Sequence, residues 1–154
     1  MVELRTILLA EDNPKDVELT LEALAEHNLA NHVTVVKDGV ETMEFLRREG
    51  KYKVRRPGNP AVLLLDIKMP RMDGIEVLRA IRGDPALKTL PVVMLTSSRE
   101  ERDLISSYML GVNAYVVKPV DFQDFIEAVK QIGVFWAVIN ELPPEGVLAN
   151  GEKS

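Results

Sequence analysis

The sequence predicts a doubly wound α/β fold of the (βα)₅ type, with one open parallel sheet of five strands and helices on both faces. Three observations lead to it. Five short apolar runs alternate with five amphipathic helical patterns along the 154 residues. The runs are continuously apolar, which is typical of parallel strands covered on both faces. Each helical pattern also begins at a capping residue with an acid three positions later.

The expected strands lie at residues 6–10, 33–36, 61–65, 92–95 and 114–117. The helical pattern after each strand repeats its apolar side chains every three or four residues, as an amphipathic helix does. The capping pairs are Asn13/Asp16, Asp38/Glu41, Asp73/Glu76, Ser98/Glu101 and Asp121/Asp124. An acid in the first turn also favours the positive end of the helix dipole. These pairs therefore set the five helix starts.

Composition limits the classes of function. The chain is 46% hydrophobic and 28% charged, and its 19 Lys plus Arg against 24 Asp plus Glu give a net charge of −5. This balance argues against a nucleic-acid binder. The sequence has no cysteine, which excludes disulfides and thiolate metal sites and fits a reducing compartment. No apolar run is long enough to span a membrane and no export signal is visible, so we expect a cytoplasmic protein.

We expect one domain over residues 1–139, whose fifth helix extends from residue 122 to residue 139. Residues 140–154 contain Pro143 and Pro144 and read as a short irregular tail, and we expect no output domain. Residues 50–60 form a long basic loop.

Polar side chains follow four of the five expected strands, at the ends where an open α/β sheet binds its ligands. The first strand leads into Glu11 and Asp12, and the third leads into Asp66. The fourth and fifth lead into Thr96 and Lys118. Because the carboxyl ends of parallel strands share one edge, we expect three carboxylates, a hydroxyl and an ammonium group to converge there.

This set of residues suits phosphoryl chemistry. Crowded carboxylates repel one another and take up protons unless a positive charge neutralises them. A hard divalent cation that keeps some waters is the simplest remedy, which favours Mg²⁺ over Zn²⁺. Lys118 offers a point charge for a phosphoryl oxygen, and an aspartate beside Mg²⁺ can attack phosphorus to form an acyl phosphate. Phosphoryl transfer needs mainly positioning and charge neutralisation, and both are present.

The motifs around these residues resemble those of the receiver domain of bacterial two-component response regulators, over roughly residues 5–136. They are Leu8-Leu9-Ala10-Glu11-Asp12-Asn13, Leu64-Leu65-Asp66-Ile67-Lys68-Met69-Pro70-Arg71-Met72-Asp73-Gly74, Met94-Leu95-Thr96-Ser97-Ser98 and Ala114-Tyr115-Val116-Val117-Lys118-Pro119. The resemblance implies a CheY-like, flavodoxin-like sheet with strand order 2-1-3-4-5. The first acid is Glu11 where the family more commonly has Asp.

The resemblance also implies a role for each matching residue. Asp66 would be the phosphoacceptor. Asp12, Asp66 and the backbone carbonyl of Lys68 would bind Mg²⁺ directly, and Glu11 would act through a metal-bound water.

Four further positions carry family roles. Lys118 would hold a phosphoryl oxygen, Thr96 would move toward the phosphoryl group, and Tyr115 would swing inward. The Lys118–Pro119 peptide bond would be cis. Gly74 would open the third helix where close backbone packing is needed.

Residues 122–144 and the loop up to Pro60 resemble the stand-alone receivers that accompany bacterial and cyanobacterial phytochromes. This resemblance implies a phytochrome-type sensor histidine kinase as partner. Residues 132–139 are apolar almost all round, more than one helix face needs. We therefore expect a homodimer through the fourth helix, the fifth strand and the extended fifth helix, with the contact residues Tyr108, Phe122, Phe135, Trp136 and Ile139.

The main expectation is a single-domain response regulator that accepts a phosphoryl group on Asp66 and switches protein contacts, with no outside substrate. A phosphorelay intermediate or a phosphate sink remains open. An aspartate-dependent phosphatase is disfavoured because Lys68 occupies the position of its second aspartate. A flavodoxin-like cofactor binder is disfavoured because Glu11 and Asp12 would repel a phosphate. The complete acidic set also disfavours a pseudo-receiver.

Overall fold

The computed structural model describes residues 6–108, 110–112 and 114–139, with only the backbone described at residues 31, 107 and 136. Its strands are β1 Ile7–Ala10, β2 Val33–Val36, β3 Val62–Asp66, β4 Val92–Thr96 and β5 Ala114–Val117. All pair in parallel in the order β2-β1-β3-β4-β5. The predicted doubly wound fold and strand order are confirmed.

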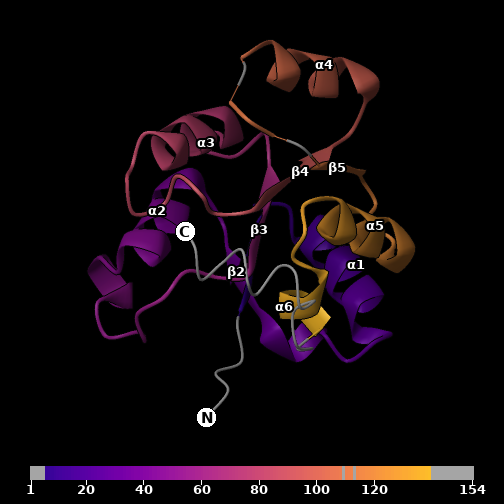
Figure 1. Cartoon of the computed structure of the whole chain (residues 1–154), viewed down its shortest axis with the longest axis horizontal. Coiled ribbons are helices and arrows are strands. Elements are labelled where there is room, and N and C mark those ends of the chain that lie inside the picture. Colours follow the sequence, from indigo (N-terminus) through magenta and orange to yellow (C-terminus); the bar gives the residue numbers. More distant parts are fainter. Residues whose placement is uncertain (1–5, 109, 113, 140–154) are drawn as a thin grey trace.

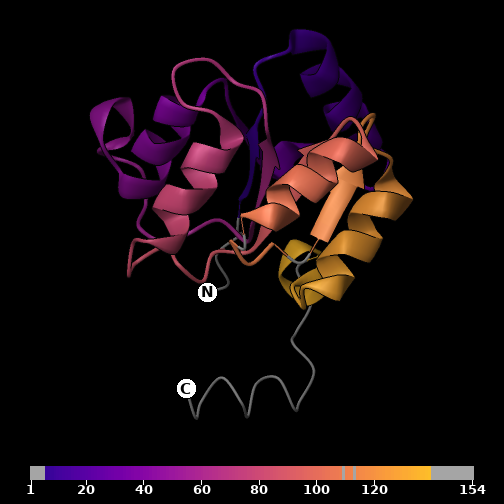
Figure 2. The ribbon, with the colours of Figure 1, turned by 90° about the horizontal axis from the view of Figure 1, so that it is seen from above.

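Helices cover both faces of the sheet (Figures 1 and 2). They are α1 Pro14–Ala25, α2 Gly39–Arg47, α3 Gly74–Arg82, α4 Arg99–Ser107, α5 Phe122–Gln131 and α6 Phe135–Ile139. One hydrophobic cluster joins the sheet to α2, α3 and α4, and a second joins it to α1, α5 and α6. Both faces of the three central strands are buried, which explains their continuously apolar sequences. Among the described helices, none is long and apolar enough to cross a membrane.

The five predicted helix starts are confirmed by their caps. The side chains of Asn13, Asp38, Asp73, Ser98 and Asp121 each accept a hydrogen bond from a backbone N–H in the first turn that follows. At Asp73 the bonding is reciprocal, because Glu76 accepts from the Asp73 N–H in turn. The sequence therefore specifies where each of these helices begins.

The predicted extension of the fifth helix to residue 139 is wrong. Helix α5 ends at Gln131, and α6 begins at Phe135 after a break. Gly133 has φ 78°, the left-handed conformation that ends a helix, and the Val134 N–H donates to the Val129 carbonyl at 2.9 Å. The chain turns there and packs α6 on the second cluster. The expected tail, residues 140–154, lies outside the described residues.

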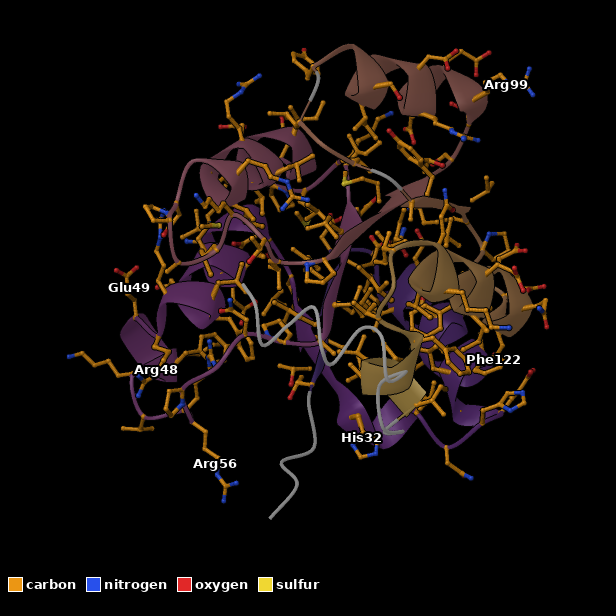
Figure 3. The ribbon with its side chains drawn as sticks, viewed as in Figure 1. His32, Arg48, Glu49, Arg56, Arg99 and Phe122 are labelled. Carbon is orange, nitrogen blue, oxygen red and sulfur yellow. The ribbon has the colours of Figure 1, made fainter. Side chains whose placement is uncertain are left out.

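The long segment between α2 and β3 contains a 3-10 turn, Gly50–Tyr52, that folds back onto α2. Tyr52 packs on Phe45 and donates a hydrogen bond to Glu41 at 2.8 Å. Figure 3 shows Arg48, Glu49 and Arg56 projecting from this end of the molecule. The segment is thus a structured edge of the domain.

Candidate functional site

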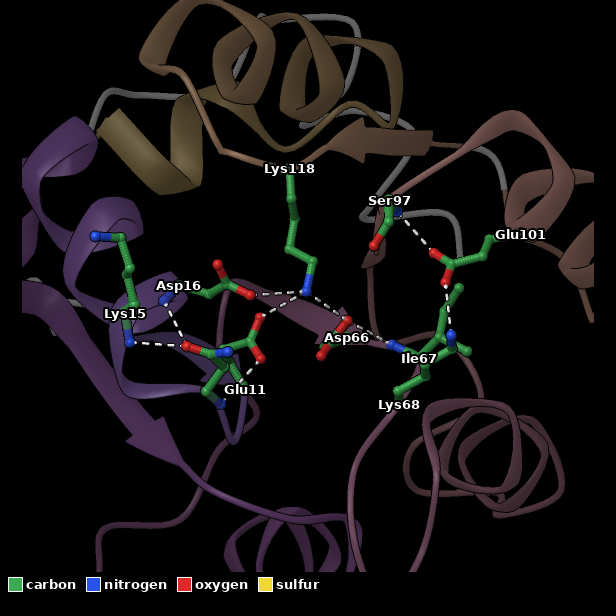
Figure 4. A network of polar contacts seen from close by, with 10 residues as sticks. Glu11, Lys15, Asp16, Asp66, Ile67, Lys68, Ser97, Glu101 and Lys118 are labelled. Atoms are coloured by element: carbon green, nitrogen blue, oxygen red, sulfur yellow. Dashed lines mark hydrogen bonds and ion pairs between the residues drawn. The ribbon is translucent and has the colours of Figure 1, made fainter.

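Lys118 lies at the centre of a polar network at the carboxyl ends of β1, β3 and β5 (Figure 4). Its ammonium nitrogen lies 3.1 Å from an oxygen of Asp66 and 3.2 Å from an oxygen of Glu11. It also lies 3.1 Å from an oxygen of Asp16. The structure thus brings the predicted residues Glu11, Asp66 and Lys118 together.

Three carboxylates form a compact cluster beside this lysine. Glu11, Asp12 and Asp66 each offer an oxygen, and these atoms all lie within 4.8 Å of one another. Glu11 and Asp66 are buried, whereas Asp12 is exposed. The cluster therefore has a deep side and a side open to solvent.

The surroundings of the buried Glu11 side chain disfavour its ionised form. Burial, together with the nearby Asp66 carboxylate, raises the pKa of Glu11 to about 7. Burial by itself would lower the pKa of Lys118, but the charges of Asp66, Asp16 and Glu11 outweigh it and raise that pKa. Lys118 is therefore a permanent cation, and one positive charge is too few for the acids around it.

Backbone geometry fixes the loop after β3. The Gly74 N–H donates to the Ile67 carbonyl at 2.7 Å, and a Cβ at Gly74 would collide with the carbonyl of Asp66. The Ile67 N–H donates to the Asp66 side chain at 2.9 Å and orients that carboxylate. The expected close packing at Gly74 is confirmed, and the Lys118–Pro119 bond is cis as the resemblance implied.

Thr96 ends β4 next to Asp66 and is fully buried. Among the described residues its hydroxyl oxygen is a buried side-chain polar atom without a hydrogen-bond partner. A buried polar group normally has a partner, and an orphan calls for an explanation. A donor at this strand end, beside Asp66 and Lys118, can donate to an anion bound there.

Tyr115 lies on β5 and points toward α4. Its hydroxyl is 3.0 Å from the Ser106 hydroxyl, and the Arg102 guanidinium lies 4.9 Å from the centre of its ring. In this structure Tyr115 is thus linked to α4, outside the acidic cluster. The inward swing that the resemblance implied remains a prediction.

The described residues among those expected at a partner surface lie on different elements and have different neighbours. Tyr108 is exposed after α4, but Phe122 stacks on His27 of α1 at 3.6 Å between ring centres. Phe135 and Ile139 pack partly buried against the second core cluster, because α6 folds back. The Trp136 side chain lies outside the described part of the structure. Among the described residues, the large apolar side chains exposed around α4 and β5 are Leu104, Tyr108 and Val117, of which Tyr108 was expected.

Two contacts at the site were missed by sequence reasoning. Asp16 was assigned only to the first turn of α1, yet it also reaches Lys118, 102 positions away. The Lys68 ammonium nitrogen lies 3.8 Å from a carboxylate oxygen of Glu101. The other Glu101 oxygen accepts a hydrogen bond from the Ser97 N–H at 2.7 Å. The one available signal for Asp16 is its place one turn after Asp12, on the helix that begins at the site.

The donor set fits a hard divalent cation. Oxygen ligands alone are what Mg²⁺, Mn²⁺ and Ca²⁺ prefer, and the set contains no soft donor. Burial and the nearby Asp66 carboxylate raise the pKa of Glu11, and a bound cation would favour its ionised form. Asp12, Asp66 and Glu11 are the residues that could hold it.

Comparison with known proteins places these features in a family. The model of the response regulator receiver domain matches residues 7–130. Response regulator Rcp1 of Synechocystis sp. is 38% identical over 139 residues, which cover 90% of this chain and 93% of that protein. The Mn²⁺-bound form of Rcp1 superposes with a TM-score of 0.68, covering 91% of this chain and 99% of that one.

Two further solved structures are similar to this chain. The bacteriophytochrome response regulator AtBRR is 57% identical, with a TM-score of 0.85, and the match covers 91% of this chain and all of that one. The phosphorylated cyanobacterial phytochrome response regulator RcpA is 42% identical, with a TM-score of 0.68, and the match covers 87% and 94% of the two chains.

Proposed function

Because the chain belongs to the response regulator receiver domain family, we propose that it accepts a phosphoryl group on Asp66 from a phytochrome-type histidine kinase and switches its protein contacts in response. The observation that carries this proposal is the contact between Asp66 and Lys118 beside a cluster of acids, with the buried Thr96 at the end of the neighbouring strand β4. The protein is a signalling protein, and an outside substrate is not needed to explain its site.

Each residue has a defined part in the transfer. An Asp66 oxygen attacks the phosphorus of the donor, the new P–O bond forms, and the bond to the donor atom breaks. Lys118 donates to a phosphoryl oxygen, and Thr96 gains an acceptor for its hydroxyl. Asp12, Asp66 and the Lys68 carbonyl would hold Mg²⁺, and Glu11 would act on it through a water. The bound ion would supply positive charge that neutralises the carboxylates when an anionic donor approaches.

Phosphorylation changes the surface of the domain on the α4 side. Tyr115 joins β5 to Ser106 and Arg102 of α4, so a shift of Thr96 and Tyr115 is felt there. The exposed Leu104, Tyr108 and Val117 near this link form the contact surface for a homodimer or a downstream partner. We assign the protein to the cytoplasm, where such kinases present their phosphoryl groups.

Incubation with acetyl phosphate and Mg²⁺ tests the proposal. Wild type should gain the mass of one phosphoryl group, bound as an acid-labile acyl phosphate. Asp66→Asn should keep the fold and lose the label. Full labelling of Asp66→Asn would refute the assignment of the phosphoacceptor.

The partner is tested separately with a panel of histidine kinases that includes a red-light-regulated one. Phosphotransfer that is fastest from the phytochrome-type kinase supports the pairing. Equal or faster transfer from unrelated kinases would favour a phosphorelay intermediate or a phosphate sink.

A further inference from the structure

Asp16 is an acid beyond those that the proposed phosphotransfer uses. Its carboxylate lies 3.1 Å from the Lys118 ammonium nitrogen, as close as the phosphoacceptor Asp66. It is not one of the three acids of the candidate metal cluster. Figure 4 shows it on the α1 side of Lys118, with Asp66 on the opposite side.

The start of α1 fixes the position of this acid. Asp16 lies in the first turn, and its N–H donates to the Asn13 side chain at 3.2 Å. A carboxylate carried on a capped helix turn loses little further entropy when it binds a cation. Asp16 is therefore a pre-positioned partner for Lys118.

A count of donors shows what the contact does. A lysine ammonium has three N–H donors, and Lys118 lies within ion-pair distance of three carboxylates, Glu11, Asp16 and Asp66. A phosphoryl oxygen that binds Lys118 must displace one of them. A cation at the acidic cluster would draw oxygens of Glu11 and Asp66 toward itself, but it would leave Asp16 on the lysine.

We infer that Asp16 is a positioning residue that holds Lys118 in the resting state and competes with the phosphoryl group for its ammonium. This inference rests on the proposed function. It makes Asp16 a restraint that sets how readily the site accepts an anion at Asp66.

Substitution of Asp16 by asparagine separates this role from structure. Asp16→Asn keeps the side-chain shape and the N–H that donates to Asn13, and removes only the charge. Glu18→Gln is the matched control. Glu18 is exposed on the same helix, and this substitution also removes one negative charge. Both variants should melt at the wild-type temperature.

Two measurements give the expected result. With saturating Mg²⁺, Asp16→Asn should bind beryllofluoride about 5-fold more tightly and be phosphorylated by acetyl phosphate about 5-fold faster than wild type, the upper range for a partly exposed ion pair. Glu18→Gln should match wild type. Unchanged or weaker binding by Asp16→Asn would overturn the inference.

A double-mutant cycle tests whether Asp16 acts through Lys118. In a Lys118→Ala background, Asp16→Asn should no longer accelerate labelling by acetyl phosphate. A full acceleration in that background would show a plain charge effect and refute competition for the ammonium. Failure of the proposed function gives a different pattern, because wild type and Glu18→Gln would then also bind no beryllofluoride and take up no label.

Discussion

The acidic cluster and helix α4 border the same strand ends, but different forces hold them. At the cluster, Glu11 and Asp66 are 1% and 5% exposed and share Lys118 as a cation. In α4, Ile105 is the one buried side chain among those described, and Leu104 is 49% exposed. Helix α3 on the same face buries Val77, Leu78 and Ile81.

This difference shows where the molecule can change at low cost. Buried charges with directional partners leave the cluster few alternative arrangements. A helix that buries one side chain has little packing to lose, so its local opening costs less than that of α3. A charge added at Asp66 is therefore expected to be met by movement at α4, with α1 and α3 unchanged.

Removal of the divalent cation should have the largest effect, and it should act on the acidic cluster. With excess chelator, labelling by acetyl phosphate should fall by about 100-fold or more, because the donor would approach uncompensated carboxylates. Asp12→Asn should weaken Mg²⁺ binding by about 10-fold or more, measured by calorimetry. Equal labelling rates with and without chelator would show that the acidic cluster works without a metal.

Lys118→Ala should separate chemistry from its consequence. The variant should still be labelled on Asp66, since the attacking oxygen remains, but it should lose most of the phosphorylation-induced change in association. In the proposed mechanism Lys118 links a phosphoryl oxygen to the end of β5 and so to Tyr115. Sedimentation with and without beryllofluoride measures the change, and a full wild-type response in Lys118→Ala would contradict this link.

The pH dependence of stability should expose the strain at Glu11. Its pKa is raised from 4.5 to about 7 in the folded protein, so the protonated form is favoured on folding. The metal-free protein should be most stable below pH 4.5, as far as Glu11 is concerned, and should lose about 1–3 kcal/mol as the pH rises through 7.

Mg²⁺ should offset this loss, because the ion requires the ionised carboxylate. The rise in melting temperature on adding Mg²⁺ should therefore grow between pH 5 and pH 7.5. A rise that is independent of pH would contradict the assignment of Glu11 to the cluster.

Sequence patterns specified the site because its residues follow strand ends, where topology alone brings distant positions together. Glu11, Asp66, Thr96 and Lys118 were found in this way. The break between α5 and α6 was missed because the apolar residues 132–139 outweighed the glycine at position 133, although glycine is the residue that ends helices. Asp16 was missed because the start of α1 already accounted for its position, and its place one turn after Asp12 is a weak sign of a contact with a distant cation.

Amide hydrogen exchange with and without beryllofluoride and Mg²⁺ tests the central claim most directly. In wild type, bound beryllofluoride should change the exchange of amides in α4, β5 and the loop after β4, and leave α1 and α3 unchanged. Asp66→Asn should show no change anywhere. Equal changes in α3 and α4, or a response that persists in Asp66→Asn, would contradict a switch that starts at Asp66 and reaches the surface through α4.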